Sequence, residues 1–441
     1  MVYKKGIIWG LIIAVVSLAM VLVGIFYWKN LRGVGPALRP PVGDIVKDLE
    51  GMPDPVDSTG SQPTPSATAG TAPQAENNTD FPLKLPDGFS ISIFAKDLPG
   101  ARVMEFDTFG NMWVSQTSQG AVSLLEVKDG KVVRQDVVLK NLKKPHGLAF
   151  HPEHKTLLYV AEEHRVSTIP TYSEGQLEKI IDLPSGAGHF TRTINFGPDK
   201  RLYVSIGSSC NVCAESDNRR AKIFSANDDG SNFQEFARGF RNAVFMTWHP
   251  KLKNMWVTEM GRDLLGDDLP PDEINVIPIK AETNSGLSVA DQNPVQNFGW
   301  PNCYGKNIHD TEFDKNTYIR NPCMDPFEIP SYVDLQAHSA PLGLGFVPAS
   351  WPAEYRDDLI VAYHGSWNRT KPTGYKLVRM KLDAQGNYLG MEDFITGWYV
   401  PGSGKGPEGA LGRPVDVKFY NGALYVSDDK AGVIYKIEYK K

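Results

Sequence analysis

The chain has 441 residues, a formal net charge of −5, 41% hydrophobic residues and 22% charged residues. A chain of this length can bury a large core, and its slight acidic excess excludes the broad basic surface that nucleic-acid binding requires. The composition therefore predicts a globular protein that does not bind nucleic acid.

An uncharged apolar segment, IIWGLIIAVVSLAMVLVGIFYW, occupies residues 7–28. As a helix it is long enough to cross a bilayer core of roughly 30 Å. A cleaved signal peptide is the alternative, but its apolar core is usually shorter and is followed by small residues, whereas this segment ends in Phe26–Lys29. Basic residues flank both ends, so they do not decide the orientation. We expect residues 1–32 to form an uncleaved transmembrane anchor.

Residues 33–80 are rich in Pro, Ser, Thr and Gly, as in STGSQPTPSATAGTAPQ. Such a composition cannot bury enough apolar surface to offset the entropy of ordering. This segment is predicted to be a disordered, flexible linker, with the folded domain spanning residues 81–441.

One pattern recurs six times in that domain: a strand ending in Phe or Trp, a turn, and a strand such as Leu-Tyr-Val or Met-Trp-Val. The copies contain FDTFGNMWVS, FHPEHKTLLYVA, FGPDKRLYVS, WHPKLKNMWVT, FVPASWPAEYRDDLIVA and FYNGALYVS. Their central valines are Val114, Val160, Val204, Val257, Val361 and Val426. Six such hairpins without intervening helices predict an all-β fold, a six-bladed β-propeller. A β-sandwich is the alternative, but the fixed internal motif argues against it.

Two further strands flank the six repeats. FSISIF, residues 89–94, precedes the first repeat, and GVIYKIEY, residues 432–439, follows the last. Pairing these two segments in one blade would close the ring and leave only short edges.

Polar residues recur where each blade enters its first strand and leaves its second strand. In a propeller these loops open at one end of the central channel. The residues at these positions include His146, His189, Arg241, Asn242, His338, His364 and Arg413. One such histidine or arginine alone would be an ordinary structural residue. Their repetition predicts a functional site at one concave mouth.

Several motifs, in their order along the chain, resemble those of a known family. GHFTRTINFGPDKRLYVSIGSSCNVC, ARGFRNAVFMTWHP, NFGWPNC, HSAPLGLGF and HGSWNRTKPTGYKLVRMKLD are similar to segments of the glucose/sorbosone dehydrogenases, including soluble aldose sugar dehydrogenases. These are propellers that use pyrroloquinoline quinone (PQQ) and calcium. The resemblance implies oxidation of an aldose or a related, sorbosone-like hydroxy-aldehyde, with electrons passed to an external acceptor such as a cytochrome or a quinone.

The resemblance also assigns roles to three residues of the predicted mouth. His189 matches the base that removes the substrate hydroxyl proton, a task that suits imidazole because its unperturbed pKa is about 6.5. Arg241 and Asn242 match the pair that contacts the quinone oxygens, where a cation stabilises developing negative charge.

Other matches concern the PQQ carboxylates and the calcium ion. Arg413 matches a carboxylate-binding arginine, and Arg369 and Lys371 are alternatives for a second cationic ligand. Calcium maps onto the backbone carbonyls of Gly261 and Arg262, and this hard ion prefers such oxygen ligands. Soluble glucose-oxidising relatives have proline where this chain has Arg262.

The four cysteines form two pairs, Cys210 with Cys213 and Cys303 with Cys323. The CxxC pair has no βαβ context typical of a redox motif. A four-thiolate zinc site is an alternative, but the second pair lacks the short spacing of zinc ligands. We predict two disulfides, which indicate an oxidising compartment. This places the domain outside the membrane, periplasmic or extracellular, and the N-terminus inside.

Two alternative functions belong to other classes. A calcium-dependent lactone hydrolase would be expected to gather carboxylates and asparagines at the mouth, whereas arginines dominate here. A non-catalytic cell-surface binding module would not need His189 or Arg241.

Overall fold

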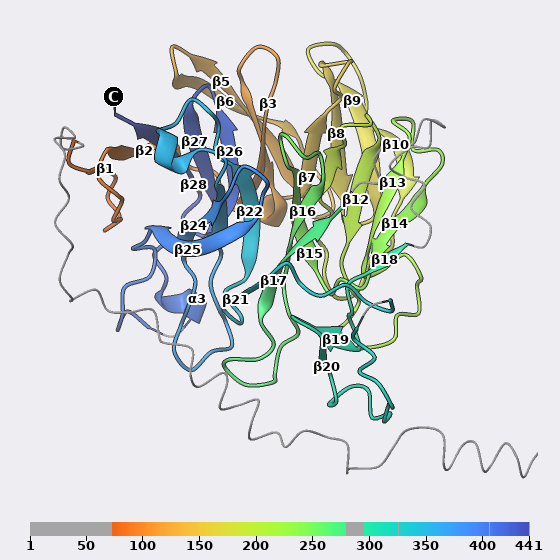
Figure 1. The fold of residues 1–441 in the computed structure, drawn as a ribbon. Helices are drawn as coiled ribbons and strands as arrows, with labels where there is room; N and C mark the ends of the chain where they lie inside the picture. Colours follow the sequence, from red (N-terminus) through yellow and green to blue (C-terminus); the bar gives the residue numbers. More distant parts are fainter. Residues whose placement is uncertain (1–72, 279–294, 325, 405, 441) are drawn as a thin grey trace, which may run out of the picture. The chain divides into compact units, whose positions relative to one another are not determined.

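The computed structural model describes residues 73–278, 295–324, 326–404 and 406–440, and the structural statements below concern these residues. The described residues within 73–313 and 323–440 belong to one compact unit. Within its described part, strands form six large sheets and one two-stranded sheet (Figure 1). The first strand of each large sheet contacts the first strand of the next sheet, so that the sheets form a ring. Between the third and fourth sheets, the contact is made by the second strand β12 with the first strand β15. The predicted six-bladed β-propeller is confirmed.

The first three blades follow one another along the chain. The first contains β3 (Ala101–Phe106), β4 (Met112–Gln116), β5 (Ala121–Lys128) and β6 (Lys131–Leu139). The second contains β7 (Gly147–Phe150), β8 (Leu157–Glu162), β9 (Arg165–Pro170) and β10 (Glu178–Asp182). The third contains β11 (Ile194–Phe196), β12 (Leu202–Ile206), β13 (Lys222–Ala226), β14 (Gln234–Arg238) and the parallel strand β18 (Gln296–Asn297).

In the fourth blade, a long stretch of chain separates the third strand from the fourth, whereas the connection from the fourth blade to the fifth is short. The fourth contains β15 (Ala243–Trp248), β16 (Met255–Glu259), β17 (Asp272–Ile277) and β21 (Val333–Leu335). The fifth contains β22 (Pro341–Phe346), β23 (Leu359–Tyr363), β24 (Lys376–Leu382) and β25 (Tyr388–Ile395). Outside the blades lie the hairpin of β19 (Cys303–Tyr304) and β20 (Ile308–His309), η2 (Thr117–Gln119), η3 (Ala353–Tyr355) and α3 (Gly406–Gly409).

The sixth blade combines both flanks of the repeat region. It contains β26 (Pro414–Tyr420), β27 (Ala423–Asp428), β28 (Val433–Tyr439), β2 (Phe89–Ala95) and β1 (Glu76–Asn78). β2 pairs antiparallel with β28, with Phe89 opposite Tyr439. The predicted closure of the ring is therefore confirmed.

A strand, β1, lies within the segment that was predicted to be a linker up to residue 80. β1 adds in parallel to β2, and the Asn77 side-chain amide donates hydrogen bonds to the carbonyls of Phe81 (2.6 Å) and Leu83 (3.1 Å). The open edge of β2 thus orders residues whose composition alone indicates a linker. The rest of that segment, 33–72, lies outside the described residues.

The predicted membrane span, residues 7–28, also lies outside the described residues. Among the helices of the described part, none is long and apolar enough to cross a membrane.

The second strand of each blade is buried on both faces because neighbouring sheets pack against it. β4, β12, β16, β23 and β27 are buried at every position, and all six central valines have no exposed surface. In the outermost strand β6, most residues are exposed and the others are partly buried. The repeated Leu-Tyr-Val pattern therefore marks the sandwiched layer of each blade.

The turns between first and second strands rely on a recurring aspartate. Asp107 accepts hydrogen bonds from the amide of Asn111 (3.0 Å) and from the Trp113 indole (3.0 Å). In the third blade, Asp199 accepts from the amide of Arg201 (3.2 Å) and from the Tyr203 hydroxyl (2.9 Å). Each aspartate thus links its turn to the second strand.

Both predicted disulfides are present, Cys210–Cys213 and Cys303–Cys323. The first closes the loop after β12, and the second connects β19 to the segment that leads to β21. The zinc alternative is wrong because all four sulfur atoms are in these bonds.

Candidate functional site

A cavity of about 190 Å³ lies where loops from several blades meet. Its lining residues are Arg102, Gly188, His189, Phe190, Thr191, Asn242, Val244, Met260, Leu342 and His364. These residues lie at the starts of first strands or just beyond second strands, as the sequence pattern predicts. A larger cavity of about 460 Å³ among the first strands contains none of the predicted site residues, so volume alone does not identify the site.

His189 lies in the loop before β11 and is held in one tautomer. Its Nδ1 lies 3.2 Å from the carbonyl oxygen and 3.0 Å from the hydroxyl of Ser208. A carbonyl oxygen can only accept, and the Ser208 hydroxyl donates its proton to the Cys210 carbonyl (2.6 Å). The His189 proton therefore resides on Nδ1, which leaves Nε2 as the hydrogen-bond acceptor.

The charge state of His189 follows from its surroundings. Burial, together with the nearby Arg241 guanidinium, lowers its pKa to about 3. The imidazole is therefore neutral near pH 7 and able to accept a proton.

Two glycines allow the loops around His189 to approach closely. A Cβ at Gly207 would lie 2.6 Å from the Asn242 side-chain oxygen and 2.7 Å from the His189 Cβ. A Cβ at Gly188, where φ is +62°, would lie 2.4 Å from the Ser208 carbonyl oxygen. Only glycine fits these positions without displacing the loops.

Arg241 lies in the loop before β15, and its side chain is 7% exposed. The guanidinium donates to the Asp263 carboxylate (2.7 Å) and, through Nε, to the Asn211 carbonyl (3.1 Å). A third, longer contact reaches the Met260 carbonyl (3.4 Å). These contacts fix a cation beside the cavity.

The neighbouring Asn242 is buried and contributes to the cavity wall. Its backbone amide donates to the Glu259 carboxylate (3.0 Å), and its side-chain oxygen accepts from the Thr191 hydroxyl (3.4 Å). Its side-chain nitrogen donates to the Met260 sulfur (3.7 Å). A buried amide with one weak acceptor is suited to donate a hydrogen bond into the cavity.

His364 and Arg102 also line the cavity and share one carboxylate. Nε2 of His364 donates to Asp429 (2.9 Å), and Arg102 forms an ion pair with the same carboxylate (2.7 Å). Burial lowers the pKa of His364 to about 4, although Asp429 opposes this shift. The Nδ1 atom of a neutral His364 is therefore a second hydrogen-bond acceptor at the cavity.

The other two candidate histidines have different surroundings. His146 is fully buried, accepts a hydrogen bond from Arg102 Nε (3.2 Å) and lies 3.1 Å from the Thr193 hydroxyl. Burial lowers its pKa well below the usual range. His338 donates to the carbonyls of Gly266 (2.9 Å) and Leu269 (3.1 Å). His146 thus supports Arg102, and His338 supports the loop between β16 and β17.

The remaining cationic candidates differ in exposure. Arg413 donates to the carbonyls of His364 (3.0 Å) and Gly365 (2.8 Å), and burial lowers its pKa. Arg369 donates to the Asp267 carbonyl and to the Asp268 carboxylate (3.0 Å). Lys371 is exposed.

The two residues proposed for calcium lie just after β16. Gly261 donates its amide to Asp272 (3.0 Å), and the Arg262 side chain is paired with Asp310 (2.6 Å). Within the described residues, no hydrogen bond reaches the carbonyl oxygens of Gly261 and Arg262. A small cavity of about 20 Å³ here is also lined by Glu259 and Glu273.

Buried carboxylates make this region electronegative at high pH. Burial raises the pKa of Asp272 to about 6 and of Glu273 to about 7. Burial also raises the pKa of Glu259 well above its usual range, and the nearby Glu273 adds to the shift. Free carbonyls and carboxylates are the ligands that a hard cation such as calcium takes, so the donor set fits calcium.

The hydrogen-bond donors near the 190 Å³ cavity fit an anionic cofactor. Arg102 lines the cavity, Arg241 directly precedes the lining residue Asn242, and Arg413 donates to the carbonyl of the lining residue His364. The side-chain nitrogen of Asn242 has only a weak partner. Planar guanidinium groups suit carboxylates well.

Sequence reasoning missed Arg102, Met260 and Asn211. Arg102 precedes Phe106 by the same interval that separates His146 from Phe150, so the repeat could have identified it. Met260 directly follows β16. Asn211 lies inside the Cys210–Cys213 loop, which has no repeating signal.

The ring of six blades is the fold of several solved structures, among them the PQQ domain of a Coprinopsis cinerea pyranose dehydrogenase, with a TM-score of 0.66 at 20% identity over 83% of this chain and 99% of that chain. Residues 83–440 match the TrAA12-like family. The chain belongs to this family.

The chain is similar to proteins of several organisms. An uncharacterized protein of Borreliella burgdorferi is 30% identical over 382 residues, which cover 81% of this chain and 91% of that protein. A pyrroloquinoline quinone-dependent pyranose dehydrogenase of Coprinopsis cinerea is 24% identical over 68% of this chain, a match that spans only 44% of the fungal protein. The calcium structure of a Trichoderma reesei family AA12 enzyme has a TM-score of 0.68 at 20% identity, covering 83% of this chain and all of that chain.

Proposed function

We propose that this protein is a PQQ- and calcium-dependent dehydrogenase that oxidises an aldose or a related, sorbosone-like hydroxy-aldehyde. The observation that carries the proposal is the cavity in which an acceptor nitrogen of His189 lies near Asn242, with Arg241 beside them. When bound, PQQ supplies a quinone that takes up hydride. The family relationship supports the same reaction class.

His189 is proposed as the general base. Its Nε2 accepts the proton of the substrate hydroxyl, because Nδ1 already carries a proton and the low pKa keeps the ring neutral. Arg241 is proposed as the fixed cation that stabilises negative charge at the quinone oxygens, with Asn242 as a second donor.

Arg413 and Arg369 are proposed to hold the carboxylates of PQQ. Arg369 is favoured over Lys371 because its guanidinium is already ordered by Asp268, whereas the lysine is exposed. The carbonyls of Gly261 and Arg262 would hold the calcium ion, since they have no other partner among the described residues.

The cellular setting is also a proposal. We infer that residues 7–28 anchor the protein in a membrane with its N-terminus inside, and that the propeller is periplasmic or extracellular. Two disulfides in the domain support an oxidising compartment. The electrons would pass to a cytochrome or a quinone outside the protein.

The test is reconstitution of the purified full chain. PQQ and calcium are titrated separately and together while a redox dye is reduced with a panel of aldoses, and lactones are offered in parallel. We expect dye reduction only when both cofactors are present. Dye reduction without PQQ would contradict the proposal, lactone hydrolysis without PQQ would favour the hydrolase, and inactivity with every substrate would favour a binding module.

A further inference from the structure

The loop from Ser208 to Cys213 touches both residues that are proposed to carry the chemistry. At one end, the Ser208 hydroxyl accepts from His189 Nδ1 (3.0 Å) and donates to the Cys210 carbonyl (2.6 Å). At the other end, Asn211 contacts Arg241. No other loop in the described part of the chain connects the base and the cation in this way.

Asn211 uses both its backbone and its side chain as a clamp. Its carbonyl accepts from Arg241 Nε (3.1 Å) and from the Trp300 indole (3.4 Å). Its side-chain oxygen accepts from Arg241 Nη2 (3.0 Å) and from the Asp263 amide (2.8 Å), and its side-chain nitrogen donates to the Asp263 carbonyl (3.0 Å).

These bonds reach a loop of another blade. Asp263 lies two residues beyond Gly261, between β16 and β17, and its carboxylate forms the ion pair with Arg241. Asn211 therefore fixes the guanidinium together with the carboxylate that neutralises it. Two contacts on one guanidinium restrict its rotation more than the ion pair alone.

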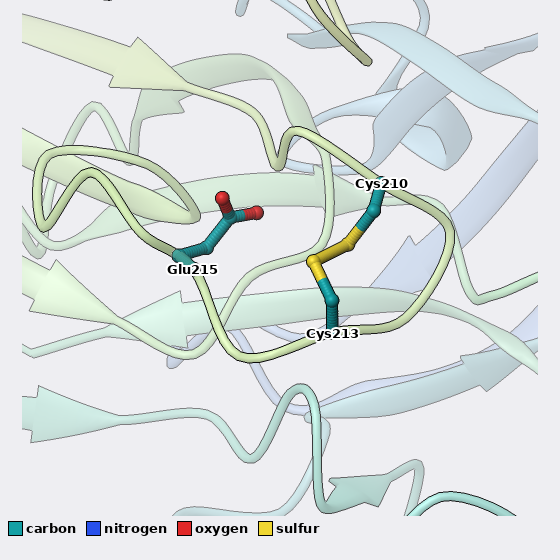
Figure 2. A group of neighbouring side chains, drawn as sticks. All are labelled: Cys210, Cys213 and Glu215. Carbon is teal, nitrogen blue, oxygen red and sulfur yellow. A yellow bond between two sulfur atoms is a disulfide. The ribbon is translucent and has the colours of Figure 1, made fainter.

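The Cys210–Cys213 disulfide closes the turn that presents Asn211. Figure 2 shows Glu215 on the same loop as the disulfide. The Glu215 carboxylate accepts from the amide (2.7 Å) and the hydroxyl (2.6 Å) of Ser209. The loop is thus closed by the disulfide and is also held by the two hydrogen bonds between Ser209 and Glu215.

We propose that the disulfide-closed loop Ser208–Cys213 sets the position of Arg241 relative to His189, and that Asn211 is the positioning residue. This inference rests on the proposed function for its effect on catalysis. Its structural part concerns the protein without cofactor and is measured separately.

The structural measurement is hydrogen exchange of the full chain without PQQ. The Asp263 amide donates to the Asn211 side-chain oxygen, so its exchange rate reports the clamp directly. We expect Asn211→Ala to speed this exchange, whereas Val212→Ala, in the same loop, leaves it unchanged. Asn211→Asp keeps the acceptor oxygen and is expected to restore protection relative to Asn211→Ala. Wild-type exchange in Asn211→Ala would overturn the inference.

The catalytic measurement is turnover at saturating PQQ, calcium and sugar. A displaced Arg241 should lower kcat by about 10²-fold, with a much smaller change in KM, since small misplacements of a reacting group have effects of this size. Val212→Ala should retain wild-type kcat. Unchanged kcat in Asn211→Ala would overturn the positioning role even in an active enzyme.

The contribution of the covalent closure is tested by Cys210→Ser/Cys213→Ser, which leaves Asn211 in place. We expect faster exchange of the Asp263 amide and a lower kcat than in the wild type. Wild-type values for both would show that the disulfide does not hold the clamp. If the wild-type protein lacks PQQ-dependent activity, the proposed function fails, while hydrogen exchange still decides whether Asn211 positions the loop.

Discussion

At the scale of single residues, the hydrogen bonds of Ser208 determine which nitrogen of His189 can act. Because Nδ1 is committed to the loop, only Nε2 is free for a substrate. Arg413 contacts backbone carbonyls and has no such link to His189. Removing either side chain should therefore have a different effect on the protein.

For His189→Ala we expect nearly unchanged PQQ affinity but a loss of 10²- to 10⁴-fold in turnover, on the order seen for general bases. For Arg413→Ala we expect weaker PQQ binding by roughly 2 to 5 kcal/mol, with activity restored at high PQQ. Equilibrium PQQ titration and rates at saturating substrate measure both. Normal turnover of His189→Ala would move the base to another histidine, and His364 would be tested first because it lines the cavity.

Asp416 offers a test of buried charge. Burial raises its pKa to about 6, although Lys418 opposes the shift, and its carboxylate accepts the Met104 amide of the neighbouring blade (2.9 Å). A raised folded-state pKa means that the neutral acid is favoured in the fold. Its contribution to stability is full below the unfolded pKa of about 4 and is lost as the pH rises through about 6.

Asp416→Asn stays neutral while keeping an acceptor oxygen. Relative to the wild type, its free energy of unfolding should increase by about 2 to 3 kcal/mol between pH 4 and pH 7. Denaturant unfolding at a series of pH values measures the difference. A difference that stays constant with pH would show that Asp416 is charged throughout in the folded protein.

From the sequence, the position of a residue within its blade could be predicted, but the depth of its side chain could not. The same spacing within the repeat applies to His146, which was predicted, and to Arg102, which was missed. Only Arg102 lines the cavity, whereas His146 is buried and accepts a hydrogen bond from it. How deeply a side chain lies depends on contacts from other blades, which no spacing encodes. Asn211 acts through a loop between strands, where there is no period to read.

At the scale of elements, β2 closes the ring through an aromatic anchor. Phe89 has no exposed surface, and its ring makes edge contacts with Tyr355, Phe394 and Tyr439 at centroid distances of 5.1 to 5.2 Å. Tyr355 and Phe394 belong to the fifth blade region, so Phe89 joins two blades. The alternation in FSISIF predicts the strand, but not this junction.

Phe89→Ala should lower the free energy of unfolding by about 3 to 5 kcal/mol, because it removes a buried aromatic side chain and leaves a cavity. The matched control is Phe109→Ala, whose side chain is 64% exposed in the turn after β3, and which should change stability little. Chemical denaturation compares the two variants. Equal losses would mean that β2 does not anchor the ring through Phe89.

At the scale of the whole molecule, the repeat predicted the six blades, and the two strands that flank the repeats predicted the closure of the ring. Each blade of a propeller packs against its neighbours in the same way, so the same pattern of apolar residues recurs in every blade. The strand β1 was missed because its order comes from the edge it joins and not from its own composition.

The disulfides connect the fold to its compartment. Mass spectrometry without reduction, on protein isolated from the cells that make it, should find Cys210 linked to Cys213 and Cys303 linked to Cys323. Cys303 and Cys323 are buried, whereas Cys210 and Cys213 are partly exposed, so a mild thiol reductant should open the first loop before the second. Four free thiols would contradict an oxidising compartment.

The pairing of β2 with β28 also determines how the molecule responds to mechanical force. Phe89 at the start of β2 lies opposite Tyr439 at the end of β28, and the Lys440 amide donates to the Gly88 carbonyl (2.7 Å). The chain thus enters and leaves the ring at the same point. A load that pulls these two points apart peels the strands open one hydrogen bond at a time instead of shearing them together, so under tension the ring should open first at this blade and at low force.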